Sequence, residues 1–91
     1  MSVASHEGMK RLLKFEHTQF QKAFAASQEN TNRATLEAAI VEANVYMNLL
    51  KEGRVAGIVY QDRAMIRDCI EAVGKLEKLV AIFRRELQKF K

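Results

Sequence analysis

A regular run of apolar residues over the last third of the chain constrains the fold more than any other feature of the sequence. From Ile66 to Phe90 apolar side chains recur at alternating intervals of three and four residues, which is the spacing of one side of a long helix. The seam consists of Val59, Ile66, Cys69, Val73, Leu76, Val80, Phe83, Leu87 and Phe90. Met65, Ala72 and Leu79 make it broader than the seam of a simple coiled coil. More than one helix must cover such a stripe, so the sequence predicts a helical bundle.

The composition supports a single all-α domain over residues 1–91. The chain has no proline and only four glycines, so long helices can run without interruption. A chain of this length can form a modest core without disulfides or metal. Its single cysteine cannot form an intrachain disulfide, which suits a reducing, cytoplasmic environment. We expect no secretory signal and no membrane partner, because every apolar run is far shorter than the ~20 residues needed to span a bilayer.

Three helices are predicted, in an antiparallel up-down-up bundle with a long C-terminal helix. The first runs from about Ser5, a candidate N-cap, to about Ser27, and a polar stretch follows over residues 27–32. The second runs from about residue 32 to residue 52 and ends at Gly53, with residues 53–57 as the connection. The third begins between residues 58 and 62 and continues nearly to residue 91. The centre of the core is predicted to consist of Ile66, Val73, Leu76, Val80 and Phe83.

The predicted helix over residues 32–52 is apolar on two opposite sides. One face consists of Leu36, Ile40, Ala43, Met47 and Leu50, and the other of Ala34, Ala38, Val41, Val45 and Leu49. A helix with two apolar faces normally lies between other helices. Either the helices form a layer with this one in the middle, or the second face binds another chain, most simply a second copy in a dimer. The competing interpretation is that Leu13, Phe20 and Phe24 of the first helix fill the second face within one chain.

No residue pattern in the sequence predicts a catalytic, metal or cofactor site. His6 and His17 lack a second ligand at helical spacing, so both are interpreted as surface residues. Cys69 lies within the apolar seam and is interpreted as a small buried hydrophobic residue. The glycines do not form a phosphate-binding loop. We therefore expect a protein that is not an enzyme and that binds no cofactor.

Two residues of the first helix do not fit its apolar pattern. Glu16 lies on the apolar side. It either sits at the edge of the stripe or pairs with an arginine such as Arg54, Arg63 or Arg67, or it forms a buried specificity contact or an acid in a small pocket. Phe15 points away from the apolar side. It is either a partly covered surface residue or an anchor in an interface.

The outer side of the last helix is predicted to carry a basic ridge. Of the net charge of +4, the excess lies in residues 53–91, which contain nine cations and five anions. The ridge consists of Arg67, Lys78, Ile82, Arg85 and Lys89, with Ile82 as a small apolar centre. Such a face is either simply solvated or a docking surface for an acidic partner. It lacks the stacking aromatic residues, and the sequence lacks the short helix-turn-helix glycine, that would favour nucleic-acid binding.

The leading functional hypothesis is a non-enzymatic protein–protein interaction module of the adaptor, chaperone or inhibitor type. It would self-associate or bind a helical or acidic partner protein. One alternative is a basic helical domain that binds nucleic acid through the ridge. The other is a small all-helical enzyme with a site between chains, for which Glu16 and the arginines at 54, 63 and 67 are the only candidate cluster.

Overall fold

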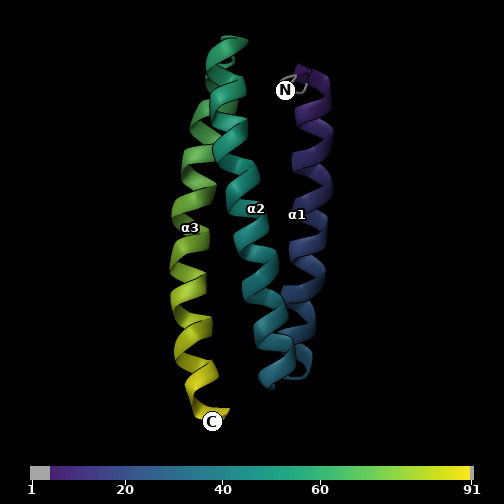
Figure 1. Cartoon of the computed structure of the whole chain (residues 1–91), viewed down its shortest axis with the longest axis vertical. Helices are drawn as coiled ribbons and strands as arrows, with labels where there is room; N and C mark the ends of the chain where they lie inside the picture. The colour runs from purple at the N-terminus through teal and green to yellow at the C-terminus, as the bar shows by residue number, and fades with distance from the viewer. Residues whose placement is uncertain (1–4, 91) are drawn as a thin grey trace.

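The chain folds into three antiparallel helices arranged up, down and up (Figure 1). The computed structural model describes residues 5–90, which form α1 (His6–Glu29), α2 (Arg33–Val59) and α3 (Arg63–Leu87), with a short 3₁₀ turn η1 over Gln88–Phe90. No strand occurs among these residues. The predicted all-α fold with a long C-terminal helix is confirmed.

The middle helix, α2, packs along both of its neighbours, whereas α1 and α3 make few contacts with each other. Near one end of the molecule, His6 Nε2 lies 2.9 Å from Asp62 Oδ2, just before α3 begins. Near the other end, Phe24 packs against Phe83 with ring centroids 5.8 Å apart. The result is an elongated bundle of 45 × 23 × 19 Å in which α2 packs against both other helices.

Each helix begins at a side-chain cap. Ser5 Oγ, Asn32 Oδ1 and Asp62 Oδ1 each accept a hydrogen bond from the backbone N–H three residues further along, at 2.9, 2.9 and 3.0 Å. At the second cap the bond is reciprocated, because the Asn32 backbone N–H donates to Thr35 Oγ1 at 3.1 Å. Caps of this kind contribute about 1 kcal/mol each, which explains why the helices begin close to the predicted residues.

The predicted end of the second helix at Gly53 is wrong. The helix continues through Gly53 and Gly57 for two further turns, and the chain reverses at Gln61, whose φ of 55° is left-handed. Both glycines lie buried where helices approach closely. A Cβ atom at Gly53 would lie 2.9 Å from Cys69 Sγ, and one at Gly57 would lie 2.8 Å from Ile66 Cγ1. These glycines therefore permit close packing rather than ending the helix.

The later turn moves the start of α3 to residue 63, just beyond the predicted interval. Val59 consequently belongs to α2 and is 59 % exposed, so its assignment to the seam of the last helix is wrong. At the other end of the seam, Phe90 lies in the 3₁₀ turn and is 40 % exposed. The seam that packs in the core is therefore shorter than the sequence predicts.

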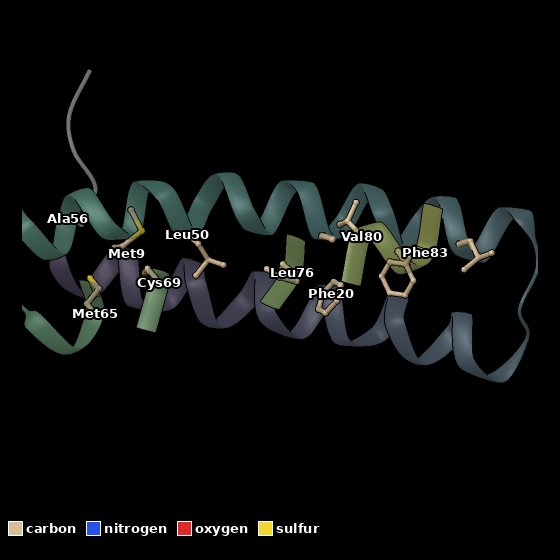
Figure 2. Close-up of a cluster of buried hydrophobic side chains, with 12 residues drawn as sticks. Met9, Phe20, Leu50, Ala56, Met65, Cys69, Leu76, Val80 and Phe83 are labelled. Carbon is tan, nitrogen blue, oxygen red and sulfur yellow. The ribbon is translucent and has the colours of Figure 1, made fainter. Parts of the chain in front are cut away.

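The core extends along the length of the bundle between the helices. Figure 2 shows the buried cluster, which includes Met9, Phe20, Leu50, Ala56, Met65, Cys69, Leu76, Val80 and Phe83. Leu76, Val80 and Phe83 are buried as predicted, but Ile66 and Val73 are only half-buried, so the predicted centre is wrong at these two positions. The physical reason is that both lie on the side of the α3 seam away from α1, where α2 alone covers them.

Candidate protein-interaction surfaces

The predicted second apolar face of α2 is largely uncovered in the single chain. Val41 and Val45 are 58 % and 45 % exposed, Ala34 and Ala38 are also exposed, and only Leu49 is half-buried. Leu49 packs against the core and, with Val45, lines a hollow that α2 shares with α1. The four exposed residues are available to another molecule.

α1 packs on a different side of α2 from the one that this face occupies. Ala39 and Ala43 of α2 have no exposed surface, and the Phe20 ring lies 6.3 Å from the Tyr46 ring. Small residues on α2 allow this close approach of the two helices. The interpretation that the aromatic residues of the first helix fill the face around Val41 and Val45 is therefore wrong.

Two apolar residues of α1 extend this surface. Leu12 is 45 % exposed and Phe15 is 58 % exposed. Leu12 and Glu16 share a shallow hollow of about 270 Å³ with Val45, Asn48, Leu49 and Glu52 of α2. We call the surface formed by Leu12, Phe15, Val41 and Val45 the α1–α2 face. Sequence reasoning did not assign Leu12 to a surface, and its position at the edge of the apolar stripe of α1 is the signal that could have identified it.

Charges of opposite sign flank the two helices of the α1–α2 face. On α1, Arg11 lies four residues before Phe15 and Lys22 seven residues after it, so both flank this ring along the helix. On α2, Glu52 lines the hollow beside Val45. Arg11, Lys22 and Glu52 are exposed and form no ion pair within residues 5–90. The face therefore has a basic edge on α1 and an acidic edge on α2.

Glu16 lies at the edge of the α1–α2 face with one carboxylate oxygen out of contact with solvent. Its Oε2 atom has no hydrogen-bond partner among the described residues. No ion pair within residues 5–90 joins it to Arg54, Arg63 or Arg67, so the structure does not bring that candidate cluster together in one chain. A buried acceptor without a donor costs about 1–3 kcal/mol. This oxygen is therefore closed off within the single chain, where no described residue supplies it with a donor.

The basic ridge of α3 is fully accessible. Arg67, Lys78, Arg85 and Lys89 are exposed, and Ile82 among them is 45 % exposed. Two of the cations already have neighbours, because Arg67 Nε lies 3.2 Å from Asp68 Oδ1 and Lys89 Nζ lies 3.0 Å from Glu86 Oε1. Such exposed pairs are weak, so the ridge keeps its positive character.

A groove separates α1 from α3 on the opposite flank of α1. Its volume is about 600 Å³, and Leu13, Leu50, Met65 and Ala72 provide much of its apolar lining. Within it, the Tyr46 hydroxyl lies 3.2 Å from His17 Nδ1. The groove ends near the contacts that join α1 to α3.

Tyr46 and Cys69, two of the titratable groups that line this groove, are poor candidates for catalysis. Burial raises the pKa of the Tyr46 hydroxyl, and the nearby Cys69 raises it further. Burial also raises the pKa of the Cys69 thiol, with a smaller contribution from Asp68 and Asp62. A thiol with a raised pKa, 3 % exposed, is a weak nucleophile, which agrees with the interpretation of Cys69 as a core residue.

The described residues hold no cluster with the donor set of a metal site, since no three histidine, cysteine, aspartate or glutamate side chains converge within residues 5–90. In the same part of the chain, no helix has an apolar run long enough to cross a membrane. Comparison with known protein families, curated proteins and solved structures gives no match. The surfaces of the molecule are therefore the observations from which a function has to be argued.

Proposed function

We propose that this chain is a non-enzymatic protein–protein interaction module that forms a dimer through the α1–α2 face. The observation that carries the proposal is the exposure of Leu12, Phe15, Val41 and Val45, each between 45 % and 58 %. Leu12 and Val45 share one hollow between the two helices. Small soluble proteins seldom leave such a group of large apolar side chains in water unless a partner covers it.

The charges at the edges of the face favour one arrangement of two copies. In a two-fold dimer whose axis runs parallel to the helices, α1 of each copy lies over α2 of the other. The basic edge of α1, with Arg11 and Lys22, then meets the acidic edge of α2, with Glu52. A two-fold axis perpendicular to the helices would instead place α1 on α1 and α2 on α2, with like charges close together. Charge complementarity therefore supports the first arrangement.

The height of the residues along the bundle supports the same pairing. Leu12 and Glu16 lie level with Val45, Leu49 and Glu52 in one hollow. When α1 of a second copy lies over α2, its Arg11 side chain lies at the height of Glu52, an exposed carboxylate with no ion pair among the described residues. A guanidinium there would pair with Glu52. The second copy thus accounts for the exposed apolar surface and for the unpaired Glu52 together.

Charge exchange between the two edges tests the proposal. Arg11→Glu and Glu52→Arg should each weaken dimerisation, because each places like charges opposite each other at two symmetric positions. The double variant should restore much of the affinity, as measured by sedimentation equilibrium. Lys14→Glu, an equal change of charge on the opposite flank of α1, serves as the control. If the double variant is no better than the single ones, or the control weakens the dimer equally, the arrangement is wrong.

A further inference from the structure

One glycine of α3 has no role within the single chain. Gly74 is exposed in the middle of the helix. A Cβ atom added to it would have no atom within 4 Å other than those of the adjacent residues and of the backbone of its own helix. Glycine inside a helix is less stable than alanine by about 1 kcal/mol. Gly53 and Gly57 differ from it, since a Cβ atom at either would collide with a neighbouring helix. The open space above Gly74 is available to a group from outside the chain.

Gly74 belongs to a second heptad-spaced line of residues on α3, facing away from the core. The members follow one another at alternating intervals of four and three residues, and all are exposed. We call this line the α3 outer seam, and it consists of Arg63, Arg67, Ile70, Gly74, Glu77 and Ala81. Ile70 is 53 % exposed, and Glu77 forms no ion pair among the described residues. The line therefore combines a protruding apolar residue, a gap beside it and exposed charges of both signs, of which Arg67 also lies 3.2 Å from Asp68.

We infer that the α3 outer seam binds the same seam of a second copy in antiparallel orientation. In one register every residue of the seam lies opposite a complementary one. Ile70 lies opposite Gly74, Arg67 opposite Glu77, and Arg63 opposite the small Ala81. Because the contact is two-fold symmetric, each of these pairs occurs twice. The Ile70 side chain fills the space that the missing Cβ atom of Gly74 leaves open.

Other registers of the same seam lack this complementarity. A shift of one heptad places Arg67 opposite Arg84 in one direction and opposite Ile70 in the other. A parallel pair would place Arg67 on Arg67 and Glu77 on Glu77, and like charges at such positions are unfavourable. Charge and side-chain size therefore select the same antiparallel register, which makes a second copy a better occupant than a peptide of one charge.

Shallow hollows on both sides of Ile70 give the contact further room. One of about 430 Å³ is lined by Arg63, Ile66, Arg67, Ile70 and Glu71. The other, about 390 Å³, lies between α2 and α3 beside Gly74 and Glu77. A single helix pair with few large apolar residues is a small interface, and small interfaces belong to weak or transient complexes. We therefore expect association through this seam at high protein concentration, independently of the α1–α2 face.

Disulfide trapping tests the register directly. Ile70→Cys and Gly74→Cys are prepared separately, each with Cys69→Ala, so that each chain carries one thiol. The antiparallel register brings position 70 of one chain next to position 74 of the other, within the range of a disulfide. The mixture should cross-link about tenfold faster than either variant alone. Equal rates in the three samples would overturn the proposal, as would preferential linkage between two Gly74→Cys chains.

A charge exchange supplies a second test. Arg67→Glu and Glu77→Arg should each weaken association through the seam about tenfold or more, and the double variant should recover it. The measurement is sedimentation velocity in a Val45→Glu background, in which the α1–α2 face no longer pairs. Disulfide trapping reports on the α3 outer seam alone and needs no Val45→Glu background. Failure of the α3 outer seam is therefore distinguishable from failure of the α1–α2 face. If the double variant stays as weak as the single ones, Arg67 and Glu77 do not lie opposite each other and the proposed register is wrong.

Discussion

The glycines of the α2–α3 hairpin lie in opposite environments, and single substitutions separate their roles. Gly74→Ala should raise the free energy of unfolding by about 1 kcal/mol, because alanine favours the helix and nothing obstructs its methyl group. Gly57→Ala should lower it by about 1 kcal/mol or more. A Cβ atom there would lie 2.8 Å from Ile66 Cγ1 and 3.1 Å from the Ile66 backbone nitrogen.

Urea denaturation at a protein concentration low enough to keep the chain monomeric measures both changes. Gly74→Ala and Gly57→Ala are matched controls for each other, since each adds one methyl group to a helical glycine. Effects of the same sign would contradict the packing described for this hairpin.

Asp62 couples the start of α3 to α1 and makes stability depend on pH. Its carboxylate accepts hydrogen bonds from the Met65 backbone N–H and from His6, and these hold the pKa of Asp62 below its usual value of 3.8. A carboxyl with a lowered folded pKa contributes stability that is complete above the unfolded pKa. That stability is lost as the pH falls through the folded pKa.

Asp62→Asn tests this coupling, because asparagine caps a helix about as well as aspartate but cannot ionise. Wild type should be more stable than the variant at pH 7, and the difference should shrink as the pH falls below about 4. Thermal denaturation at a series of pH values measures it. A difference that stays constant down to about pH 2 would show that the Asp62 charge does not stabilise the fold.

At the scale of the elements, α3 is held by the rings near its C-terminal end. Phe83 is 3 % exposed and packs on Phe24, 5.8 Å between ring centroids. Phe83→Ala should lower the free energy of unfolding by about 3–5 kcal/mol, because it removes a large buried side chain and leaves a cavity. Ile82→Ala is the control, because Ile82 immediately precedes Phe83 but is 45 % exposed. It should change the free energy of unfolding far less. Equal losses measured by urea denaturation would show that the register of α3 is wrong.

Helix formation and the starts of the helices were predictable from the sequence, but the end of α2 was not. Apolar spacing and capping side chains are local signals, and they indicate the starts at Ser5, Asn32 and Asp62. In the sequence, Gly53 is equally consistent with the end of a helix and with close packing between two helices. Only the positions of Leu13 and Cys69 on the neighbouring helices decide between the two.

The candidate surface was predictable on α2 and at Phe15 of α1, but not at Leu12. The opposed faces of α2 are visible in its spacing, and Val41 and Val45 are indeed exposed. Leu12 lies at the edge of the apolar stripe of α1, and whether an edge residue is covered depends on how far α2 wraps around it. That angle follows from the small residues at the contact, Ala39 and Ala43, and no local pattern specifies it.

At the scale of the whole molecule, the two proposed surfaces lie on different helices and each pairs with itself. A chain with two independent two-fold contacts can bind two further copies at once. The α1–α2 face exposes four large apolar side chains, whereas the α3 outer seam exposes one, so the first contact should form at lower concentration. Assembly beyond the dimer should then depend on concentration and respond to changes at Arg67 and Glu77.

The central claim is that the α1–α2 face binds a second copy, and the molar mass in solution tests it most directly. Light scattering over a range of concentrations compares wild type with Val45→Glu and with Ile82→Glu, two substitutions at side chains that are both 45 % exposed. We predict at least twice the chain mass for wild type and for Ile82→Glu, and the mass of one chain for Val45→Glu at low concentration with an unchanged helical circular dichroism spectrum. A wild-type chain that remains monomeric at the highest concentration, or a Val45→Glu variant that unfolds, would contradict the account.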